Sequence, residues 1–252
     1  MATRKLPSEV AIVTGAGSGI GLATARWLSK RLPVVAVGRN TAKLETVAAE
    51  LGDAVTAYPM DVSVRSEVHE LAEALKSSGS TVNALINNAG FARSGSADLP
   101  LEELERNWDA VIATNLTGTF NMAMAIAPLL KRPDGRIVNV SSIAAYTGGR
   151  NKGSAIYAAS KSGLHGLSAG LAREFSDAGI TVNTIAPGLI ADTEFTQSWP
   201  QSRIDDMVTE IPAGRPGTAD EIAATIDFLC SDQAGFINGE IINVNGGTRF
   251  GG

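Results

Sequence analysis

Short apolar runs alternate with longer helical patterns along almost the whole chain. The short runs are rich in β-branched residues and are followed by Gly, Asn, Asp or Ser within a few positions, which is typical of strands buried in a parallel sheet. They span 10–14, 34–37, 54–58, 84–87, 136–140, 181–185 and 240–244. Helical patterns span 19–31, 41–51, 64–77, 101–127, 155–176 and 219–230. This alternation, with right-handed crossovers, predicts an α/β fold in which helices cover both faces of a doubly wound parallel sheet.

The length and composition are those of one globular domain. The chain has 252 residues, 44% of them hydrophobic, and a net charge of −5, which excludes a disordered protein. No linker, repeat or low-complexity stretch divides it, so we predict a single domain over 1–252. The polar segment 189–217 lies between Pro187-Gly188 and Pro216-Gly217 and is long enough to form a lid. We expect it to cover the carboxyl ends of the strands, where ligands bind in such sheets.

The residue types argue against several kinds of site and location. Cys230 is the sole cysteine, and His69 and His165 do not cluster with other metal ligands, so we expect neither a disulfide nor a metal site. The first ten residues lack the apolar core of a signal peptide, and the apolar stretch 120–130 is too short to span a membrane. The charges are mixed along an acidic chain, which gives no footprint for nucleic acid. We therefore expect a cytoplasmic protein without nucleic-acid or membrane partners.

A glycine-rich turn follows the first predicted strand and opens the first helix. It reads Thr14-Gly15-Ala16-Gly17-Ser18-Gly19-Ile20-Gly21, so the spacing from Gly15 is G-x-x-x-G-x-G. Without side chains, the backbone lets a pyrophosphate approach the helix N-terminus, whose free N–H groups and dipole favour an anion. The alternative is a tight turn with no ligand. Since no Lys-Ser/Thr pair closes the turn, a phosphate-transferring P-loop is disfavoured.

Polar and small residues follow the next three predicted strands. Arg39 and Asn40 stand where enzymes that prefer NAD have a carboxylate for the ribose 2′-hydroxyl, and an arginine there can bind a 2′-phosphate. We therefore expect NADP(H) as the preferred cofactor and NAD(H) as the second choice, the alternative being a surface arginine. Asp61, beside Val62, is expected to bind the adenine amino group or to cap a helix. Asn88-Ala89-Gly90 lets the backbone pass close to a ribose or forms a simple turn.

Tyr157 and Lys161 are four residues apart in a predicted helix, which places both side chains on one face. A phenol with its usual pKa near ~10 is a poor base at neutral pH, but an adjacent ammonium lowers the pKa of the phenol. Tyr157 can then exchange a proton with a carbonyl or alcohol oxygen. Ser142 follows the fifth strand at the same sheet edge and offers a hydroxyl to that oxygen. The alternative is that each is an ordinary surface or interface residue.

Together, these motifs resemble the short-chain dehydrogenase/reductase family over nearly the whole chain, from Val10 to Gly247. The shared residues are Thr14-Gly15-x-x-x-Gly19-x-Gly21, Asp61, Asn87-Asn88-Ala89-Gly90, Thr114-Asn115-Leu116, Ser142, Tyr157-x-x-x-Lys161 and Pro187-Gly188. The resemblance implies a single-domain Rossmann fold with seven strands. It also implies a catalytic tetrad of Asn115, Ser142, Tyr157 and Lys161.

The resemblance further implies a role for each member of the tetrad. Ser142 and Tyr157 would bind the substrate oxygen, with Tyr157 as the acid in reduction and the base in oxidation. Lys161 would bind the nicotinamide ribose and lower the pKa of the tyrosine, and Asn115 would hold a water that completes a proton relay. The cofactor supplies the hydride. Further cofactor contacts are implied at Pro187, Gly188, Ile190 and Thr193. Asp192 stands at the position where the family usually has threonine, and Thr193 is the next residue.

Within the family, the chain is most similar to bacterial 3-oxoacyl-acyl-carrier-protein reductases. The similarity lies in 179–183, 212–215 and 244–247, which many members share. Carrier proteins are acidic and need a basic landing patch. Pro133-Asp134 and Asp177-Ala178 stand at the positions where those reductases look basic. An acyl carrier protein is therefore not the partner that we expect.

We predict an NADP(H)-dependent carbonyl reductase or alcohol dehydrogenase that acts on a small ketone or secondary alcohol. The first alternative is a 3-oxoacyl-acyl-carrier-protein reductase, and the second is a regulator that senses NADP(H) without turnover. The sequence does not identify the substrate. Candidate substrate contacts are Ser142, Ala144, Tyr146, Arg150, Tyr157, Phe195 and Trp199.

Three glycines share one face of the helix that carries Tyr157. Gly163, Gly166 and Gly170 each cost about 1 kcal/mol relative to alanine inside a helix. Close packing against another element would offset that cost. The resemblance implies a homotetramer built partly through this helix, and the alternative is packing within the subunit.

Overall fold

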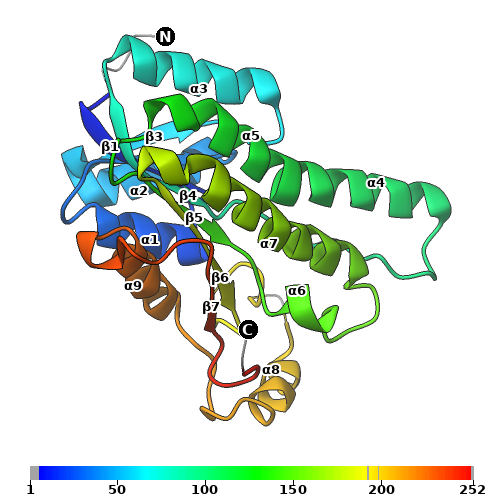
Figure 1. Cartoon of the computed structure of the whole chain (residues 1–252). Helices are drawn as coiled ribbons and strands as arrows, with labels where there is room; N and C mark the ends of the chain where they lie inside the picture. Colours follow the sequence, from blue (N-terminus) through cyan, green and yellow to red (C-terminus); the bar gives the residue numbers. More distant parts are fainter. Residues whose placement is uncertain (1–5, 192, 198, 251–252) are drawn as a thin grey trace.

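Seven parallel strands form one sheet at the centre of the molecule (Figure 1). The computed structural model describes residues 6–191, 193–197 and 199–250. The strands are β1 (Glu9–Thr14), β2 (Val34–Gly38), β3 (Val55–Pro59), β4 (Thr81–Asn87), β5 (Arg136–Val140), β6 (Thr181–Pro187) and β7 (Ile241–Val244). Their order is β3-β2-β1-β4-β5-β6-β7, and each neighbouring pair is parallel. The predicted seven-stranded Rossmann fold is confirmed.

The chain changes its direction across the sheet between β3 and β4. β1 lies between β2 and β4, so the chain moves outward one way as far as β3 and the other way from β4 to β7. Val13 of β1 is paired with Ala36 of β2 and with Ile86 of β4, so the carboxyl ends of these strands meet at one edge. Ligands bind at such a switch point in open α/β sheets. The predicted cofactor residues follow these strands.

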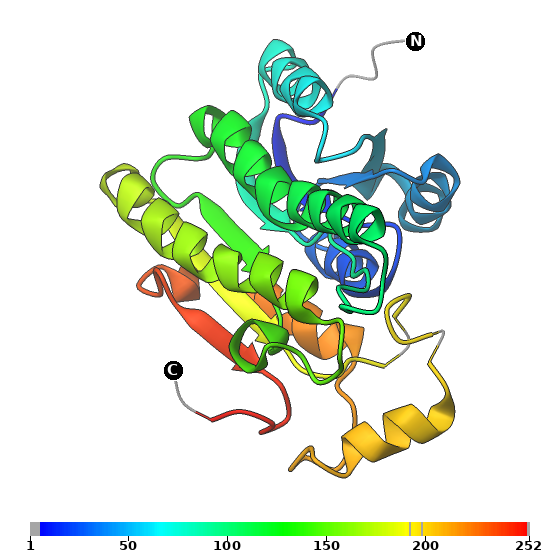
Figure 2. The same ribbon diagram turned by 90° about the vertical axis from the view of Figure 1, so that its right-hand side faces the viewer.

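Helices cover both faces of the sheet. On one face lie α1 (Gly19–Leu28), α2 (Thr41–Leu51) and α9 (Ala219–Leu229). On the other, α3 (Arg65–Ser77), α5 (Gly118–Ile126) and α7 (Ala155–Phe175) run side by side (Figure 2). In β1, Val10 and Ile12 belong to the core beneath α3 and α5, whereas Ala11 and Val13 belong to the core beneath α1 and α9. Burial on both faces explains why the strands are continuous apolar runs.

The helix predicted over 101–127 changes its geometry near the centre. α4 (Leu101–Ile112) passes through a π-helical turn, Ala113–Thr117, into α5. Asn115 lies in this turn, and such turns are frequent at functional sites. The continuous run Leu101–Leu129 is long and apolar enough to cross a membrane, although 56% of its most apolar window is buried within the protein, as in a core helix. The apolar segment is therefore longer than the stretch 120–130 expected from the sequence.

The segment 189–217 leaves the sheet after β6, and its two ends are hydrogen-bonded to each other. Ala191 N donates to Gly217 O at 2.9 Å, and Gly217 N donates to Leu189 O at 2.9 Å. Between these ends lies α8 (Gln201–Val208), at the bottom of Figure 1. The sequence pattern did not predict α8, which is only eight residues long, or the single turn α6 (Ala144–Thr147) after β5.

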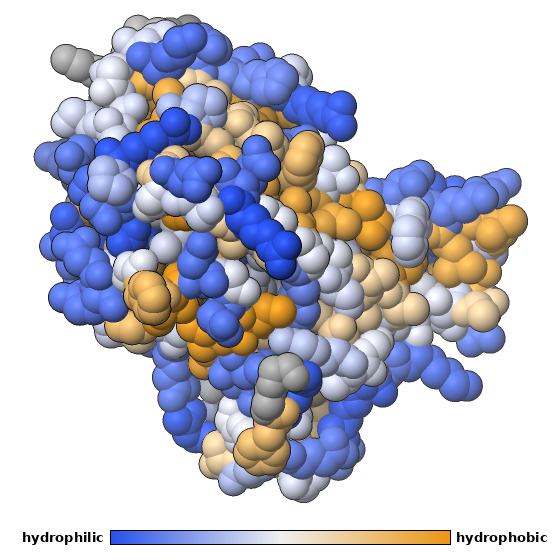
Figure 3. All heavy atoms as spheres, viewed as in Figure 1, coloured by the Kyte–Doolittle hydropathy of each residue, from blue (hydrophilic) through white to orange (hydrophobic). Residues whose placement is uncertain are grey.

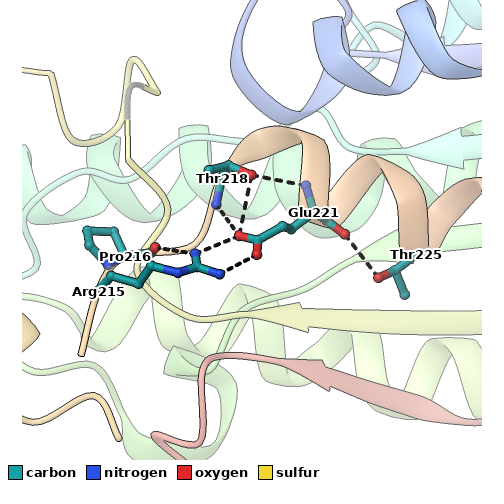
Figure 4. Close-up of polar contacts among 5 residues, drawn as sticks. All are labelled: Arg215, Pro216, Thr218, Glu221 and Thr225. Carbon is teal, nitrogen blue, oxygen red and sulfur yellow. Dashed lines mark hydrogen bonds and ion pairs between the residues drawn. The ribbon is translucent and has the colours of Figure 1, made fainter. Parts of the chain in front are cut away.

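Arg215 and Glu221 fasten the returning end of this segment to α9 (Figure 4). Thr218 Oγ1 accepts the backbone N–H of Glu221 at 3.2 Å, and Glu221 Oε2 accepts the backbone N–H of Thr218 at 2.8 Å. Arg215 donates to both carboxylate oxygens of Glu221, at 3.0 and 2.6 Å. The bonds from Arg215 and Thr218 lower the pKa of Glu221 to about 2. This capping box sets the residue at which α9 begins.

Candidate active site

A cleft of about 1580 Å³ opens at the carboxyl edge of the sheet, between the glycine-rich turn and the segment 189–217. The predicted cofactor residues that line it are Gly15, Gly17, Ser18, Gly19, Ile20, Arg39, Asn40, Asp61, Val62, Asn88, Ala89, Gly90, Tyr157, Lys161, Pro187, Gly188, Ile190 and Thr193. The predicted substrate residues Ser142, Ala144, Arg150, Phe195 and Trp199 also line it. Thr14, Gly21, Asn115 and Tyr146 do not, and Asp192 lies outside the described residues.

The glycine-rich turn is held by Thr14 and Asn88, which join the ends of β1 and β4. Thr14 Oγ1 accepts the backbone N–H groups of Asn88 and Ala89 at 2.9 and 3.0 Å. Asn88 Nδ2 donates to Thr14 O at 3.0 Å. A Cβ on Gly21 would lie 2.1 Å from Gly15 O, so no side chain fits there. Thr14 and Gly21, predicted as cofactor residues, therefore shape the turn instead of lining the cleft.

The N-terminus of α1 is open to an anion. Ser18 is its N-cap residue and has extended backbone, but its side chain makes no capping bond. The first turn of α1 contains no acidic residue. Its backbone N–H groups and the helix dipole therefore favour a phosphate group. These residues fit the pyrophosphate of a dinucleotide.

Arg39 lies in the cleft between Asp61 and the ring of Phe91. Arg39 Nη1 is 3.8 Å from Asp61 Oδ2, and Arg39 Cζ is 5.6 Å from the centre of the Phe91 ring. Asp61 Oδ1 also accepts the N–H and the hydroxyl of Ser63, at 2.9 and 2.7 Å, which stabilises the turn before α3. The N-cap residue of α3 is Val64, so Asp61 is not the cap of this helix, the alternative considered from the sequence. Asn40 caps α2 with its side chain. Phe91 directly follows the Asn88-Ala89-Gly90 turn. It belongs to no sequence motif, so its place in the cleft was not predicted.

Lys43 and Glu194 form an ion pair between α2 and the segment 189–217. Lys43 passes beside the glycine-rich turn, where a Cβ on Gly17 would lie 3.2 Å from Lys43 Cβ. Thr193, next to Glu194, lies 3.3 Å from where a Cβ on Gly19 would be. The two sides of the cleft therefore meet above the turn. Neither member of the ion pair belongs to a motif, so sequence reasoning missed both.

Tyr157 and Lys161 lie on one face of α7, beside Ser142 at the end of β5. Lys161 Nζ donates to Val140 O at 2.7 Å and lies 5.8 Å from the centre of the Tyr157 ring. Burial lowers the pKa of Lys161 to about 8. Burial also raises the pKa of Tyr157, and a hydrogen bond with Ser142 opposes that rise. The Tyr157 pKa thus moves opposite to the predicted direction, because burial outweighs the favourable contacts of the phenolate.

Asn115 is fully buried behind the cleft. Its Nδ2 donates to Phe91 O at 2.9 Å and to Ser160 Oγ at 3.0 Å, and its Oδ1 accepts Phe91 N at 3.0 Å. Ser160 Oγ donates in turn to Tyr157 O at 2.7 Å. The asparagine therefore connects the π-helical turn to the loop after β4 and to the helix that carries Tyr157. Ser160 lies inside the Tyr157-Lys161 motif, yet its type and spacing gave no signal of this role.

Aromatic residues of the segment 189–217 lie beside Tyr157. The Phe195 ring is 5.4 Å from the Tyr157 ring, and the Trp199 ring is 5.7 Å from the Phe195 ring, measured between centres. Arg150, from the loop before α7, donates to Glu210 Oε1 at 2.6 Å, just beyond α8. The structure thus brings Phe195, Trp199 and Arg150 to the same end of the cleft.

Tyr146 lies elsewhere. Its ring centre is 4.8 Å from that of His165, and Arg249 Cζ lies 3.5 Å from the Tyr146 ring centre. The tyrosine therefore packs between α7 and the C-terminal segment. Tyr146, predicted as a substrate contact, is not among the described residues that line the cleft.

The cleft is basic although the chain as a whole is acidic, with a net charge of −5. Seven basic side chains and three acidic ones are found among its described lining residues. The basic ones are Arg39, Lys43, Arg93, Arg150, Lys152, Lys161 and Arg203, and the acidic ones are Asp61, Glu194 and Glu210. A ligand with several negative charges fits this surface.

The three glycines of α7 have different surroundings. A Cβ on Gly163 would lie 2.8 Å from Leu116 Cδ2, so this glycine permits close packing within the subunit. Nothing lies within 4 Å of a Cβ on Gly166 or Gly170. Figure 3 shows hydrophobic residues along the arm formed by α4, and the exposed ones of α4 and α5 are Leu101, Trp108, Phe120 and Met124.

Known proteins resemble the chain over almost its whole length. A family model described as Enoyl-(Acyl carrier protein) reductase matches residues 15–249. Nodulation protein G of Rhizobium sp. (strain N33) is 38% identical over 248 residues, covering 98% of this chain and 99% of the relative. The 3-oxoacyl-acyl-carrier-protein reductase FabG of Thermotoga maritima is 36% identical over 248 residues, covering 96% of this chain and 98% of that protein.

The chain also resembles a solved structure over almost its whole length. A crystal structure from Brucella melitensis, described as a short-chain dehydrogenase/reductase and glucose/ribitol dehydrogenase, has a TM-score of 0.88 with this chain. The two are 30% identical, and the match covers 98% of this chain and 99% of that one.

Proposed function

The chain belongs to the short-chain dehydrogenase/reductase family and is an oxidoreductase acting on CH–OH or carbonyl groups with a nicotinamide cofactor, and we propose that it is an NADP(H)-dependent carbonyl reductase or alcohol dehydrogenase. The proposed reaction moves a hydride between the nicotinamide and a small ketone or secondary alcohol. One observation carries the proposal. Ser142, Tyr157 and Lys161 converge beside a basic cleft at the carboxyl edge of the sheet.

Each part of the dinucleotide has residues of this chain that fit it. The N-terminus of α1 would hold the pyrophosphate, and Asp61 with Val62 would contact the adenine. Tyr157 and Lys161 would bind the nicotinamide ribose, and the backbone of Ile190 would meet the carboxamide. The bound nicotinamide supplies or accepts the hydride.

Tyr157 is proposed to exchange the proton of the reaction. In reduction, its hydroxyl donates a proton to the carbonyl oxygen, while Ser142 donates a hydrogen bond to the same oxygen. The raised pKa keeps Tyr157 protonated in the chain on its own, which suits an acid. In oxidation, the positive charges of Lys161 and of the oxidised nicotinamide would favour the phenolate.

Asn115 and Lys161 are proposed to relay that proton onward. A Cβ on Gly90 would lie 3.1 Å from Asn115 Oδ1 and 3.2 Å from Lys161 Nζ, so both polar atoms approach the space left by the missing side chain of Gly90. Asn115 would hold the relay water behind Lys161. Its own bonds to Phe91 and Ser160 fix its position for this role.

The proposed preference for NADP(H) over NAD(H) rests on Arg39. The described residues directly after β2 include no carboxylate, and the Arg39 side chain is exposed and lines the cleft beside α2. A phosphate can replace Asp61 as its partner, since the ion pair is long at 3.8 Å.

Two alternatives have weaker support. The named activity of the FabG relatives favours a 3-oxoacyl-acyl-carrier-protein reductase. However, Asp134 and Asp177 lie near the amino ends of β5 and β6, at the opposite end of the sheet from the cleft, and they do not form a basic landing patch. A regulator without turnover would not need Tyr157, Lys161 and Ser142 to be kept together.

We also propose a cytoplasmic homotetramer. The exposed Gly166 and Gly170 leave a strip of α7 on which the backbone of another subunit can pack closely. The exposed hydrophobic residues of α4 and α5 would extend this interface.

The function is tested with ketones, sugars and 3-oxoacyl thioesters, each with NADPH and with NADH. The absorbance of the reduced nicotinamide reports the rate. We expect turnover of at least one ketone, and Tyr157→Phe should reduce kcat by about 10²-fold or more while the affinity for NADPH stays within a few-fold. Near-normal rates in this variant would overturn the proposed role of Tyr157.

A further inference from the structure

A row of stacked side chains runs from Tyr157 to a guanidinium on α8. Tyr157 packs against Phe195, and Phe195 packs edge-on against Trp199. Arg203 Cζ then lies 3.8 Å from the centre of the Trp199 ring. All four residues line the cleft. This wall of the cleft therefore has a phenol at one end, two apolar rings in the middle and a cation at the other end.

Arg203 differs from Arg39 and Arg150, two other arginines that line the cleft. Arg39 is near Asp61, and Arg150 donates to Glu210, so each already has a carboxylate. In the part of the chain that the structure describes, no carboxylate forms an ion pair with Arg203, and its Nε is enclosed without a hydrogen-bond partner.

Arg203 as a whole is only partly buried and lines the cleft, so a ligand carboxylate there can supply the partner that the guanidinium lacks among the described residues. The stacking on Trp199 also favours a carboxylate. It holds the guanidinium by its face and leaves the N–H groups at the edge, which is where a carboxylate binds with two parallel hydrogen bonds.

The remaining basic side chains of the cleft are less suited to this role. Arg93 lies in the loop after β4. Its Cζ is 5.5 Å from the ring centre of Phe91, and its Nη1 donates to Asn107 Oδ1 at 3.5 Å. Lys152 is exposed on the loop before α7. Neither is part of the row of rings that begins at Tyr157.

We infer that the substrate is an oxo acid, whose carbonyl is bound by Ser142 and Tyr157 and whose distant carboxylate is bound by Arg203. This inference rests on the proposed function. An apolar or aromatic segment of the substrate lies along Phe195 and Trp199, between the two polar groups. The carbonyl carbon gains a hydride and its oxygen gains a proton, giving a hydroxy acid, while the nicotinamide is oxidised. The carboxylate is unchanged and serves for recognition.

The test compares molecules that differ only in the distant group. Methyl ketones that end in a carboxylate are paired with methyl ketones of equal length that end in a methyl group, such as 7-oxooctanoate with 2-octanone. In the wild type, the acid of the best length should have the higher kcat/KM. Arg203→Gln should lower the acid-to-neutral ratio of kcat/KM by about tenfold or more, mainly through KM. Arg203→Lys should retain part of the ratio, because it keeps the charge but loses the fork.

Two further variants identify the residue responsible. Arg215→Gln removes a guanidinium that is paired with Glu221 outside the lining of the cleft, so the ratio should not change. Arg150→Gln tests the other arginine at this end of the cleft. A ratio that falls in Arg150→Gln and stays constant in Arg203→Gln would overturn the inference, as would a wild type without preference for any acid.

A binding measurement separates this inference from the proposed function. Octanoate and 1-octanol are titrated by calorimetry into the protein with NADPH. Octanoate should bind more tightly, and Arg203→Gln should remove that preference. This result without turnover of any ketone would overturn the proposed function and leave the carboxylate site standing. Turnover of ketones with equal binding of octanoate and 1-octanol would overturn the carboxylate site and leave the proposed function standing.

Discussion

Lys161 donates its ammonium N–H to the backbone carbonyl of Val140 at 2.7 Å, at the end of the strand that precedes Ser142. The side chain is 4% exposed, and its pKa is lowered to about 8 because burial disfavours the charge. The proposed catalytic lysine is therefore costly to the fold in its charged form.

The first prediction concerns the pH dependence of stability. The unfolded chain binds the Lys161 proton more tightly than the folded chain, so the contribution of Lys161 to stability rises with pH above about 8 and is constant below it. The excess stability of Lys161→Met over the wild type should be greatest near neutral pH. It should shrink by up to about 1.4 kcal/mol per pH unit between roughly pH 8 and 9.5.

Urea denaturation of the cofactor-free protein at several pH values measures this difference. Lys152→Met, on an exposed loop, is the matched control and should give a constant difference from the wild type. Parallel pH profiles for Lys161→Met and the wild type would contradict the prediction. The constant effect of losing the bond to Val140 does not alter the slope.

The second prediction is that Arg39 distinguishes the two cofactors. Arg39→Leu should weaken NADPH binding by about 10- to 100-fold, because a charge-assisted contact with phosphate is lost. NADH binding should change by about twofold or less, since NADH lacks the 2′-phosphate. Fluorescence titration gives both dissociation constants. Arg26→Leu, whose partner is Glu50 on the surface, serves as the control, and equal losses for both cofactors in Arg39→Leu would disprove the role.

The third prediction is that Ser160 positions the tetrad. Ser160→Ala removes one acceptor of Asn115 and one donor to the Tyr157 carbonyl, so both the stability and kcat should fall. We expect a loss of about 1 kcal/mol in the free energy of unfolding and several-fold in kcat, with little change in KM for NADPH. Ser162→Ala is the control, because its hydroxyl also bonds to a backbone carbonyl but lies on the exposed side of α7. A kcat equal to that of the control would show that Ser160 is only structural.

The fourth prediction is that Lys43 and Glu194 act as one clasp above the bound cofactor. Both side chains are about half exposed, so breaking the ion pair should change the stability by no more than about 1 kcal/mol. Release of NADPH should become several-fold faster in Glu194→Gln, because the pair joins α2 to the segment 189–217. Stopped-flow release from Lys43→Met, Glu194→Gln and the double variant measures the coupling. The double variant should resemble either single variant, whereas additive effects would show that the residues act separately.

The fifth prediction concerns assembly. A Cβ added at Gly166 or Gly170 has no atom of the subunit within 4 Å. Replacing either glycine with alanine should therefore stabilise a separate subunit by about 1 kcal/mol, through the higher helix propensity of alanine. In a tetramer packed through this strip, the added methyl groups would instead weaken assembly. Sedimentation velocity of the double alanine variant should show smaller species, with an unchanged circular dichroism spectrum. An unchanged mass with a higher Tm would place these glycines outside any interface. Gly163→Ala should destabilise the subunit itself, because Leu116 occupies the space.

The strands and the cofactor edge were predictable because their causes are local. A strand buried on both faces must be apolar at every position, as Val10 to Val13 are. A turn in which the backbone passes 2.1 Å from a missing Cβ requires glycine, as Gly21 shows. The spacing of Tyr157 and Lys161 places both on one face of a helix wherever that helix lies. These constraints are carried by single residues and short spacings, so they can be read along the chain.

Other features depend on residues that meet only in the folded chain. Tyr146 was expected in the cleft, but it packs against His165 and Arg249. The pKa of Tyr157 was expected to fall, and it rises because the surrounding chain removes water from the phenol. The sequence by itself determined the strands, the longer helices and the motif residues that follow the strands at the carboxyl edge. Tertiary structure alone decided their charge states and partners, since burial and pairing depend on contacts between segments far apart in the chain.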